Sequence, residues 1–378
     1  INQFVCAPTE NDCLMGRQHV CVLALVHLTG QPGFTVGIPV LDDTANTVVV
    51  NLTGWSGTEA ITNVTKPGGR QRSLHLVKMM LAGCAVDDVV RLSKERHFET
   101  DADSVDEQPA FEHYMIKRGK VADESLVASM RPCIESRLLP YVRASYNCSQ
   151  CSLCHLLLRR YSASERLSHP SHFDEMAYVT AVADLNFEHH VGGLYVQQGA
   201  HVSSRVFVPL GNDTMMFHQY DLDHGVSVHS GERLSLIAWF TTTHDSCTSA
   251  TTPWYFAAAA AGDADAQANL GRCFAVGTCG LQQDMPKAVS WHQKAAKQGH
   301  WQAQCGLAGY YLKGRGVAED KGKARKLYAA AAKKGFAPAQ HQLGEIYENG
   351  DGVPQDLRAA AAHYRNAAAQ NHTLAQFR

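Results

Sequence analysis

Three side chains in the middle of the sequence have the types and the spacing of a transition-metal site. His172 and Asp174 are separated by one residue, and His224 follows fifty residues after Asp174. Residues i and i+2 of a β-strand project to the same side of the backbone, so the first pair can reach one ion. Two imidazoles and one carboxylate that hold one face of a ferrous ion leave the opposite face open to oxygen and a co-substrate. These residues therefore predict an iron centre whose chemistry is oxidation.

A second set of polar side chains follows the second histidine. The alternating segment 233–240 predicts a buried strand, and Arg233, nine residues after His224, shares one face of it with Ser235. A guanidinium offers paired donors that match a carboxylate, and the hydroxyl can donate a further hydrogen bond. This pair of residues fits the far carboxylate of a dicarboxylic acid such as 2-oxoglutarate.

Other histidines leave an alternative for the third metal ligand. His229 also lies near the start of the predicted strand, but it precedes Arg233 by only four residues, so His224 is preferred. A histidine beside an apolar run is often a hydrogen-bonded core residue, which is the non-functional interpretation of each candidate. The histidines that we expect in loops or facing solvent are His189, His190, His201 and His218.

The residues from about 75 to 245 resemble the Fe(II)- and 2-oxoglutarate-dependent dioxygenases, and within them the prolyl 4-hydroxylase type. Besides the residues above, the matching pieces are the strand with Tyr161 ahead of His172, the strand 179–186, Gly192-Gly193 and Pro209-Leu210-Gly211. The resemblance implies a double-stranded β-helix (jelly roll) as the catalytic core, preceded by supporting helices.

The resemblance also implies roles for individual residues and a reaction. Iron is expected on His172, Asp174 and His224. Arg233 is expected on the C5 carboxylate of 2-oxoglutarate, and Tyr161 as a second contact to it or as a neighbour of the substrate. The implied reaction is hydroxylation with O2, with ascorbate as reductant and a prolyl side chain of a polypeptide as the first candidate substrate. Collagen-type members usually have a lysine in place of Arg233, so another residue or a small molecule stays open as substrate, and so does a non-catalytic scaffold.

An internal repeat occupies the C-terminal third of the sequence. Ala-Gln pairs begin every 36 or 37 residues, at Ala266, Ala303, Ala339 and Ala375, and glycine-rich turns at 314–317 and 350–354 separate two helical runs in each period. Periods of this length are typical of helix-pair solenoids. The pattern is similar to Sel-one-like repeats, relatives of the tetratricopeptide repeat, over about 252–378. The resemblance implies a platform for a polypeptide substrate or a partner protein; the alternative is a buttress for the jelly roll.

Length and composition agree with a multidomain α+β protein. The 378 residues predict an N-terminal β-rich region (1–72), a dioxygenase domain (73–247) and an all-α solenoid (252–378). Strands are expected at 20–28, 34–40 and 47–52, and helices at 74–92 and 125–143. The 34 basic and 36 acidic residues give no electrostatic case for binding nucleic acid or a membrane surface. No apolar run reaches the roughly 18 residues of a membrane span.

Cysteines and glycosylation sequences bear on the compartment. The chain has 12 cysteines, for which disulfides or buried thiols are the preferred interpretation, and Cys273 and Cys279 are spaced to bridge a helix to its turn. Two alternatives apply to residues 148–155. The segment Cys151-Ser152-Leu153-Cys154-His155 formally matches the motif for covalent haem attachment, and the three cysteines at 148–154 could form a zinc site. Together with acceptor sequences at Asn51, Asn63, Asn147, Asn212 and Asn371, the cysteines favour the secretory pathway over the cytoplasm. The first residue is Ile1, as expected of a processed or partial chain.

Overall fold

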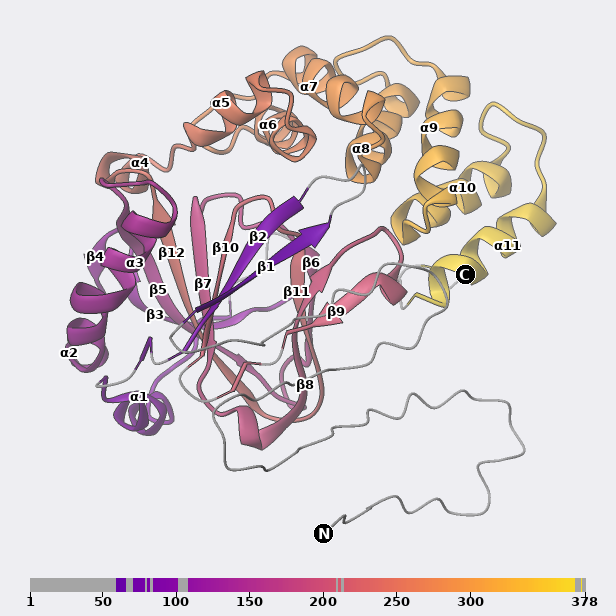
Figure 1. Ribbon diagram of the computed structural model, residues 1–378. Helices are drawn as coiled ribbons and strands as arrows, with labels where there is room; N and C mark the ends of the chain where they lie inside the picture. Colours follow the sequence, from indigo (N-terminus) through magenta and orange to yellow (C-terminus); the bar gives the residue numbers. More distant parts are fainter. Residues whose placement is uncertain are drawn as a thin grey trace, which may run out of the picture. The chain divides into compact units, whose positions relative to one another are not determined.

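A computed structural model describes residues 59–65, 71–78, 80–81, 84–100, 108–208, 210–211, 214–370 and 375 (Figure 1). The chain divides into two compact units, Ile1–Ala60 and Ile61–Arg378, and the elements from β2 onward lie in the second. The strands predicted at 20–28, 34–40 and 47–52 lie outside the described residues, as do the acceptor sequences at Asn51, Asn212 and Asn371.

Two antiparallel sheets form the first half of the described chain. The larger has the strand order β1-β2-β10-β7-β12-β5-β3-β4, and the smaller has the order β6-β11-β8-β9. The strands are β1 (Glu59–Thr65), β2 (Gln71–Val77), β3 (Phe111–Lys117), β4 (Lys120–Val121), β5 (Ser152–Tyr161), β6 (Ser168–His172), β7 (Val179–Asp184), β8 (His190–Gln197), β9 (Arg205–Phe207), β10 (Met215–Gln219), β11 (His224–Gly231) and β12 (Arg233–Thr241). From β5 to β12 the chain passes repeatedly between the two sheets, which is the jelly-roll topology. The predicted double-stranded β-helix is therefore confirmed.

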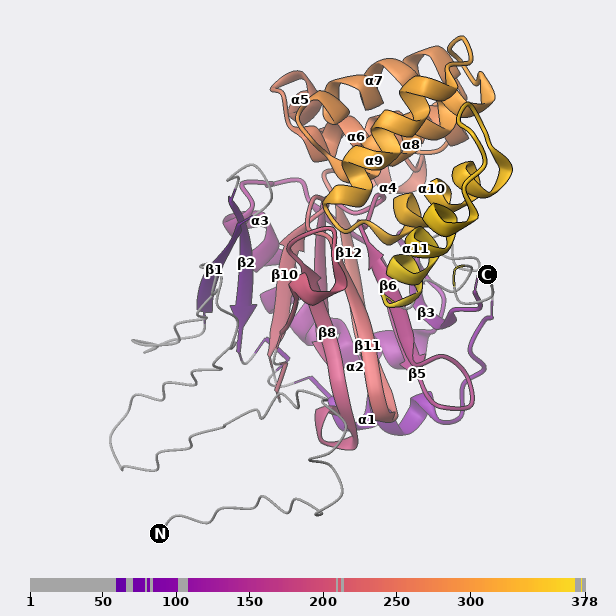
Figure 2. The same ribbon diagram turned by 90° about the vertical axis from the view of Figure 1, so that its right-hand side faces the viewer.

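Helices cover the outer face of the larger sheet. Figures 1 and 2 show α1 (Val86–Ser93), α2 (Glu124–Cys133) and α3 (Leu139–Ser145) on the side of this sheet that faces away from β8 and β11. Leu126 and Met130 of α2 belong to one buried cluster with Leu156 and Leu158 of β5. Because side chains alternate along a strand, the residues of β5 on either side of Leu156 and Leu158 point to the opposite face, toward the smaller sheet. The inner face of the larger sheet is therefore available for a ligand.

Of the two helices predicted before the jelly roll, one agrees with the structure and the other agrees only in part. The helix expected at 125–143 is confirmed as α2, a π-helical turn (Ile134–Leu138) and α3. The helix expected at 74–92 is wrong in its first part, because β2 extends to Val77 and α1 begins only at Val86. Leu76 and Val77 pair with β10 and are buried against it, so sheet pairing prevails over the helical pattern there.

The C-terminal part is the predicted solenoid of helix pairs. After α4 (His244–Thr248), which precedes the predicted solenoid, the helices are α5 (Trp254–Ala260), α6 (Ala264–Val276), α7 (Met285–Lys297), α8 (Trp301–Lys313), α9 (Lys321–Lys333), α10 (Ala337–Asn349) and α11 (Leu357–Ala368). The first helix of each pair ends at a left-handed glycine, namely Gly277, Gly314 or Gly350. The second begins at an aspartate whose side chain accepts a backbone hydrogen bond, namely Asp284, Asp320 or Asp356. Among the described helices, none has the length and apolar character needed to cross a membrane.

An aromatic cluster joins the jelly roll to the start of the solenoid. Tyr220, which follows β10, shares a buried cluster with Trp254 and Tyr255 of α5 and with Leu270 of α6. Tyr178, just before β7, packs against the same cluster. The two parts of the chain therefore share apolar core rather than meeting only through polar contacts.

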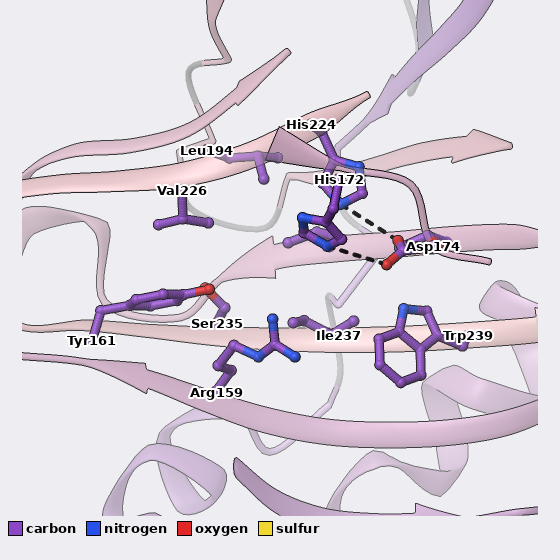
Figure 3. Close-up of a pocket in the computed structure, with 12 residues that line it drawn as sticks. Arg159, Tyr161, His172, Asp174, Leu194, His224, Val226, Ser235, Ile237 and Trp239 are labelled. Carbon is purple, nitrogen blue, oxygen red and sulfur yellow. Dashed lines mark hydrogen bonds and ion pairs between the residues drawn. The ribbon is translucent and has the colours of Figure 1, made fainter. Parts of the chain in front are cut away.

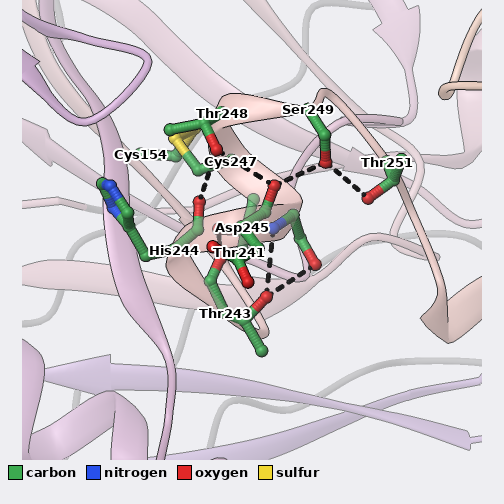
Figure 4. The surroundings of a disulfide bond; sticks show 10 residues. Cys154, Thr241, Thr243, His244, Asp245, Cys247, Thr248, Ser249 and Thr251 are labelled. Carbon is green, nitrogen blue, oxygen red and sulfur yellow. Dashed lines mark hydrogen bonds between the residues drawn. A yellow bond between two sulfur atoms is a disulfide. The ribbon is translucent and has the colours of Figure 1, made fainter.

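Disulfides link eight of the cysteines that the structure describes. The pairs are Cys84–Cys133, Cys148–Cys151, Cys154–Cys247 and Cys273–Cys279. The bridge predicted between Cys273 and Cys279 is thus confirmed. Cys151 and Cys154 belong to different disulfides, so the haem and zinc alternatives for this segment are wrong. Figure 4 shows the pair that joins Cys154 on β5 to Cys247 on α4, the helix after the last jelly-roll strand.

Candidate metal centre and ligand cavity

The structure brings His172, Asp174 and His224 together at one end of the jelly roll. His172 is the last residue of β6 and His224 the first of β11, and the two are direct partners in the antiparallel register. Asp174 follows β6, with Oδ1 3.5 Å from His172 Nε2 and Oδ2 3.4 Å from His224 Nε2 (Figure 3). One potential ligand atom from each residue lies within 4.8 Å of the other two. This geometry can hold one metal ion between the three side chains.

Hydrogen bonds orient each of these side chains toward the centre. His172 Nδ1 lies 3.0 Å from the carbonyl oxygen of Pro170, and His224 Nδ1 lies 3.1 Å from that of Leu222. Because a carbonyl only accepts, the N–H of each ring is on Nδ1 and the lone pair is on Nε2, which faces Asp174. The Thr180 hydroxyl donates to Asp174 Oδ2 at 2.6 Å. Such outer contacts fix ligand orientation before metal arrives.

Electrostatics favour the protonation states that bind metal. Burial lowers the pKa of His224 well below its usual value, and the neighbouring His218 and His172 lower it further against the opposing effect of Asp174. Burial would raise the pKa of the Asp174 carboxyl, but His224, His172 and His218 hold it well below the usual range. At neutral pH the aspartate is therefore ionised and His224 is neutral, as metal binding requires.

Further histidines surround this cluster. His218 on β10 is fully buried, with Nε2 3.9 Å from Asp174 Oδ2 and its ring centroid 4.4 Å from that of His224. The prediction that His218 lies in a loop or faces solvent is therefore wrong, because residues 215–219 form a strand that the sequence pattern did not predict. His169 stacks edge-on against His172 at 4.2 Å. The rival ligand His229 is exposed and contacts Phe207 instead.

A cavity extends from the three candidate ligands along the inner face of the larger sheet (Figure 3). Thr180 and Trp239 are cross-strand partners at the end near Asp174, and Val182 and Ile237 form the next pair along the sheet. Leu194 and Val226 line it from the smaller sheet. The donors that line it beyond this apolar stretch are Tyr161, Ser235 and Arg159. The cavity is therefore apolar in its middle and polar at both ends.

Tyr161 and Ser235 line the cavity, whereas Arg233 is not among the residues that line it. Arg233 is 1% exposed, its Nη1 is 2.6 Å from Asp184 Oδ2, and its Nε donates to Ser235 Oγ at 2.8 Å. Burial lowers the pKa of Arg233, and Asp184 opposes that effect. Nη2 is buried without a hydrogen-bond partner. Arg159, which lines the cavity, was not among the residues predicted from the sequence, although it shares a strand face with Tyr161.

The first repeats contact the segments that carry two of the candidate ligands. Arg272 on α6 forms an ion pair with Glu175, and the Tyr255 hydroxyl donates to the Glu175 carbonyl at 2.9 Å. Gln302 on α8 donates to Asp223 Oδ2 at 3.2 Å. Glu175 directly follows Asp174 in the sequence, and Asp223 directly precedes His224. The solenoid therefore holds the backbone beside the candidate metal ligands.

Replacing Arg272 by glutamine is expected to weaken divalent metal binding about tenfold, the lower end of the effect of outer contacts on metal sites. The Glu175 side chain is only 14% exposed and would lose its charged partner, which frees the segment with Asp174. A calorimetric titration with Mn(II) measures this change. Lys287→Gln is the matched control, because Lys287 is exposed and pairs with Asp284 on the same helix. Equal affinities in the two variants would contradict a positioning role for Arg272.

Comparisons with known proteins divide the chain in the same way. The Sel1 repeat model matches residues 264–300, 301–336 and 337–372, so the solenoid consists of Sel1 repeats. A search of curated proteins gives no match. A Sel1 repeat protein from Oxalobacter formigenes is 35% identical over 32% of this chain, with a TM-score of 0.32; the chain spans 49% of that protein's length.

Two solved hydroxylases are similar to the part of the chain before the repeats. A prolyl hydroxylase from Trichoplax adhaerens, in complex with a hypoxia inducible factor peptide fragment, is 11% identical, covers 47% of this chain and 87% of its own, and has a TM-score of 0.36. A prolyl-4-hydroxylase from Pseudomonas putida is 16% identical, with coverage of 49% and 92% and a TM-score of 0.31.

Proposed function

We propose that this protein is an Fe(II)- and 2-oxoglutarate-dependent dioxygenase that hydroxylates a side chain of a polypeptide, with proline as the first candidate. The observation that carries the proposal is the convergence of His172, Asp174 and His224 at one end of a cavity that presents Tyr161 and Ser235 beyond its apolar middle. Two histidines and one carboxylate with open positions are the ligand set of non-haem Fe(II) oxygenases. The spaced polar ends suit a ligand that chelates the metal through one end and has a carboxylate at the other.

With iron bound, the cofactor chemistry would split O2 so that one oxygen atom enters the substrate C–H bond and the other enters succinate as 2-oxoglutarate loses CO2. The protein's own residues position the reactants. Val182 and Ile237 exclude water along the cavity, while the Thr180 hydroxyl occupies one lone pair of Asp174 Oδ2. His172 and His224 present neutral nitrogens toward one point, fixed by backbone carbonyls.

Contacts between the repeats and the segments that carry Asp174 and His224 support a polypeptide as substrate. Helix-pair arrays provide extended surfaces on which polypeptides bind. His300, at the start of α8, has its ring 6.5 Å from that of Phe173, which precedes Asp174. A polypeptide held on the first repeats would therefore lie beside the segment that carries a metal ligand.

A location in the secretory pathway belongs to the same proposal. Four disulfides are present among the described residues, and disulfides persist mainly in oxidising compartments. Asn147 of one acceptor sequence is exposed, so an oligosaccharide could be attached there.

Succinate formation from 2-oxoglutarate tests the enzyme assignment. The full chain is incubated with Fe(II), ascorbate, O2 and either a proline-rich peptide mixture or a set of small molecules. Wild type is expected to form succinate, and His172→Ala is expected to form none. Stimulation by peptides, with one hydroxyl found per succinate, supports a polypeptide substrate, whereas stimulation only by small molecules contradicts it. Equal background turnover by both proteins would leave the non-catalytic scaffold as the better interpretation.

A further inference from the structure

Positive charge is concentrated in one part of the repeats. Residues 284–335, from the start of α7 to the turn after α9, contain 11 lysines and arginines and 3 acidic residues, whereas the whole chain contains 34 and 36. Acidic residues are therefore in excess over the rest of the chain. A basic region on an otherwise acidic protein attracts negatively charged partners to one place.

Four exposed lysines form what we call the basic surface, namely Lys294 and Lys297 on α7 and Lys326 and Lys333 on α9. Residues three or seven apart lie on the same side of a helix, so the two lysines of each helix are on one side. The Lys334 side chain donates a hydrogen bond to the carbonyl oxygen of Gly299. The C-terminal ends of α7 and α9 are therefore neighbours, and they bring the two pairs of lysines together.

The charge of the basic surface is not neutralised by the protein. Among the described residues, no carboxylate forms an ion pair with any of its four lysines, whereas Lys287 pairs with Asp284 at 3.0 Å and Lys323 with Asp320 at 3.1 Å on the same two helices. Lys294 Nζ lies 3.7 Å from the centroid of the Trp291 ring, a contact that orders the ammonium group without removing its charge. The surface therefore offers positive charge to a partner.

The fold does not require lysines at these positions. Ala362 and Ala369 of the third repeat lie 36 residues after Lys326 and Lys333, and the third repeat forms the same pair of helices. A lysine in the last turn of a helix stabilises the helix dipole, which would account for Lys333. It does not account for Lys326, because this residue lies in the middle of α9.

The same ends of α7 and α9 border the jelly roll near a candidate metal ligand. The turn after α7 carries His300, whose ring is 6.5 Å from that of Phe173, the residue before Asp174. In the turn after α9, a Cβ at Gly335 would lie 2.8 Å from the Cβ of His201, which lies between β8 and β9. A chain bound at the basic surface would therefore be close to the jelly roll at its metal-ligand end.

We propose that the basic surface binds an acidic segment of a polypeptide partner. Four neighbouring lysines can be matched by a short run of glutamate or aspartate residues, and helix-pair arrays commonly bind polypeptides. A long polyanion such as nucleic acid would extend from this surface onto the acidic remainder of the chain, which repels it. The inference goes beyond the proposed function and does not depend on it, since this binding needs neither metal nor co-substrate.

Fluorescence anisotropy with a short labelled peptide rich in glutamate tests the proposal on the full chain. The same peptide with glutamine in place of glutamate is the probe control. At an ionic strength of about 0.15 M, Lys297→Gln with Lys333→Gln is expected to raise the Kd for the glutamate peptide about tenfold, as loss of two exposed charge contacts implies. High salt should weaken binding by wild type and reduce the difference between the two proteins.

The matched control is Lys287→Gln with Lys323→Gln, which removes the same charge from the same helices. These lysines lie ten residues before Lys297 and Lys333, about 15 Å along a helix, whereas the screening length is about 8 Å at this ionic strength. Their loss should change the Kd by less than about twofold. Equal losses in the two double variants, equal binding of the two peptides, or no binding of the glutamate peptide by wild type would each overturn the proposal. Tighter binding of a single-stranded oligonucleotide or of phosphatidylserine vesicles than of the glutamate peptide would overturn the choice of a polypeptide.

Discussion

The substitution Asp174→Asn is expected to lower the affinity for divalent metal at least about a hundredfold and to reduce succinate formation to background. The amide keeps the size of the side chain but removes the negative charge that three nearby histidines surround. Asp174 is 8% exposed, and its Oδ2 accepts a hydrogen bond from the Thr180 hydroxyl at 2.6 Å, so a water molecule has little room to take the place of the carboxylate as a ligand. Titration with Mn(II), followed by the succinate assay with Fe(II), measures both effects.

Thr180→Val provides the graded comparison for Asp174→Asn. It removes only the hydroxyl that orients the carboxylate, so the expected loss of metal affinity is about tenfold, again at the lower end for outer contacts. Circular dichroism should show that both variants are folded. If Asp174→Asn bound Mn(II) as tightly as wild type, the three-residue metal centre would be the wrong assignment.

Loss of the disulfide between Cys154 and Cys247 is expected to lower the free energy of unfolding by about 4–5 kcal/mol, as loop-closure entropy implies for a long loop. The two cysteines are 93 residues apart, and the enclosed chain includes His172, Asp174 and His224. Alanine at both positions suits these buried sites better than serine, because it leaves no unpaired hydroxyl. Urea unfolding of the double variant, followed by far-UV circular dichroism, gives the change.

The pair Cys148–Cys151 is the control for loop length. These residues are only 3 apart, so the same entropy argument gives a loss of about 2 kcal/mol for the double alanine variant. Equal losses from the two pairs would contradict the loop-closure account. A reducing agent should destabilise wild type at least as much as removal of Cys154–Cys247.

The convergence of the three candidate ligands could be anticipated from the sequence because two of them are one residue apart. His172 and Asp174 need only one strand end to converge, and the jelly-roll register then adds His224 as a direct partner of His172. The repeats could also be predicted from the sequence, since a period of 36 or 37 residues indicates both the helix pairs and the turns between them.

The charge pairing beyond the apolar stretch could not be anticipated in the same way. Alternation within a strand shows which residues share a face, but not which strands are neighbours. Asp184 meets Arg233, and Arg159 meets Ser235, only because β12 lies between β7 and β5. For the same reason His218 was expected in a loop, although β10 places it beside Asp174.

The aromatic cluster around Tyr220 affects how the catalytic half can be studied. A truncated protein that stopped before Trp254 would uncover Tyr220 and Tyr178, which the full chain packs against α5 and α6. It would also lose the partners of Glu175 and Asp223 beside the metal ligands. An isolated jelly-roll fragment would therefore expose apolar surface that favours aggregation, and it would hold the candidate metal ligands less rigidly. Low activity of such a fragment would not measure the activity of the jelly roll within the full chain.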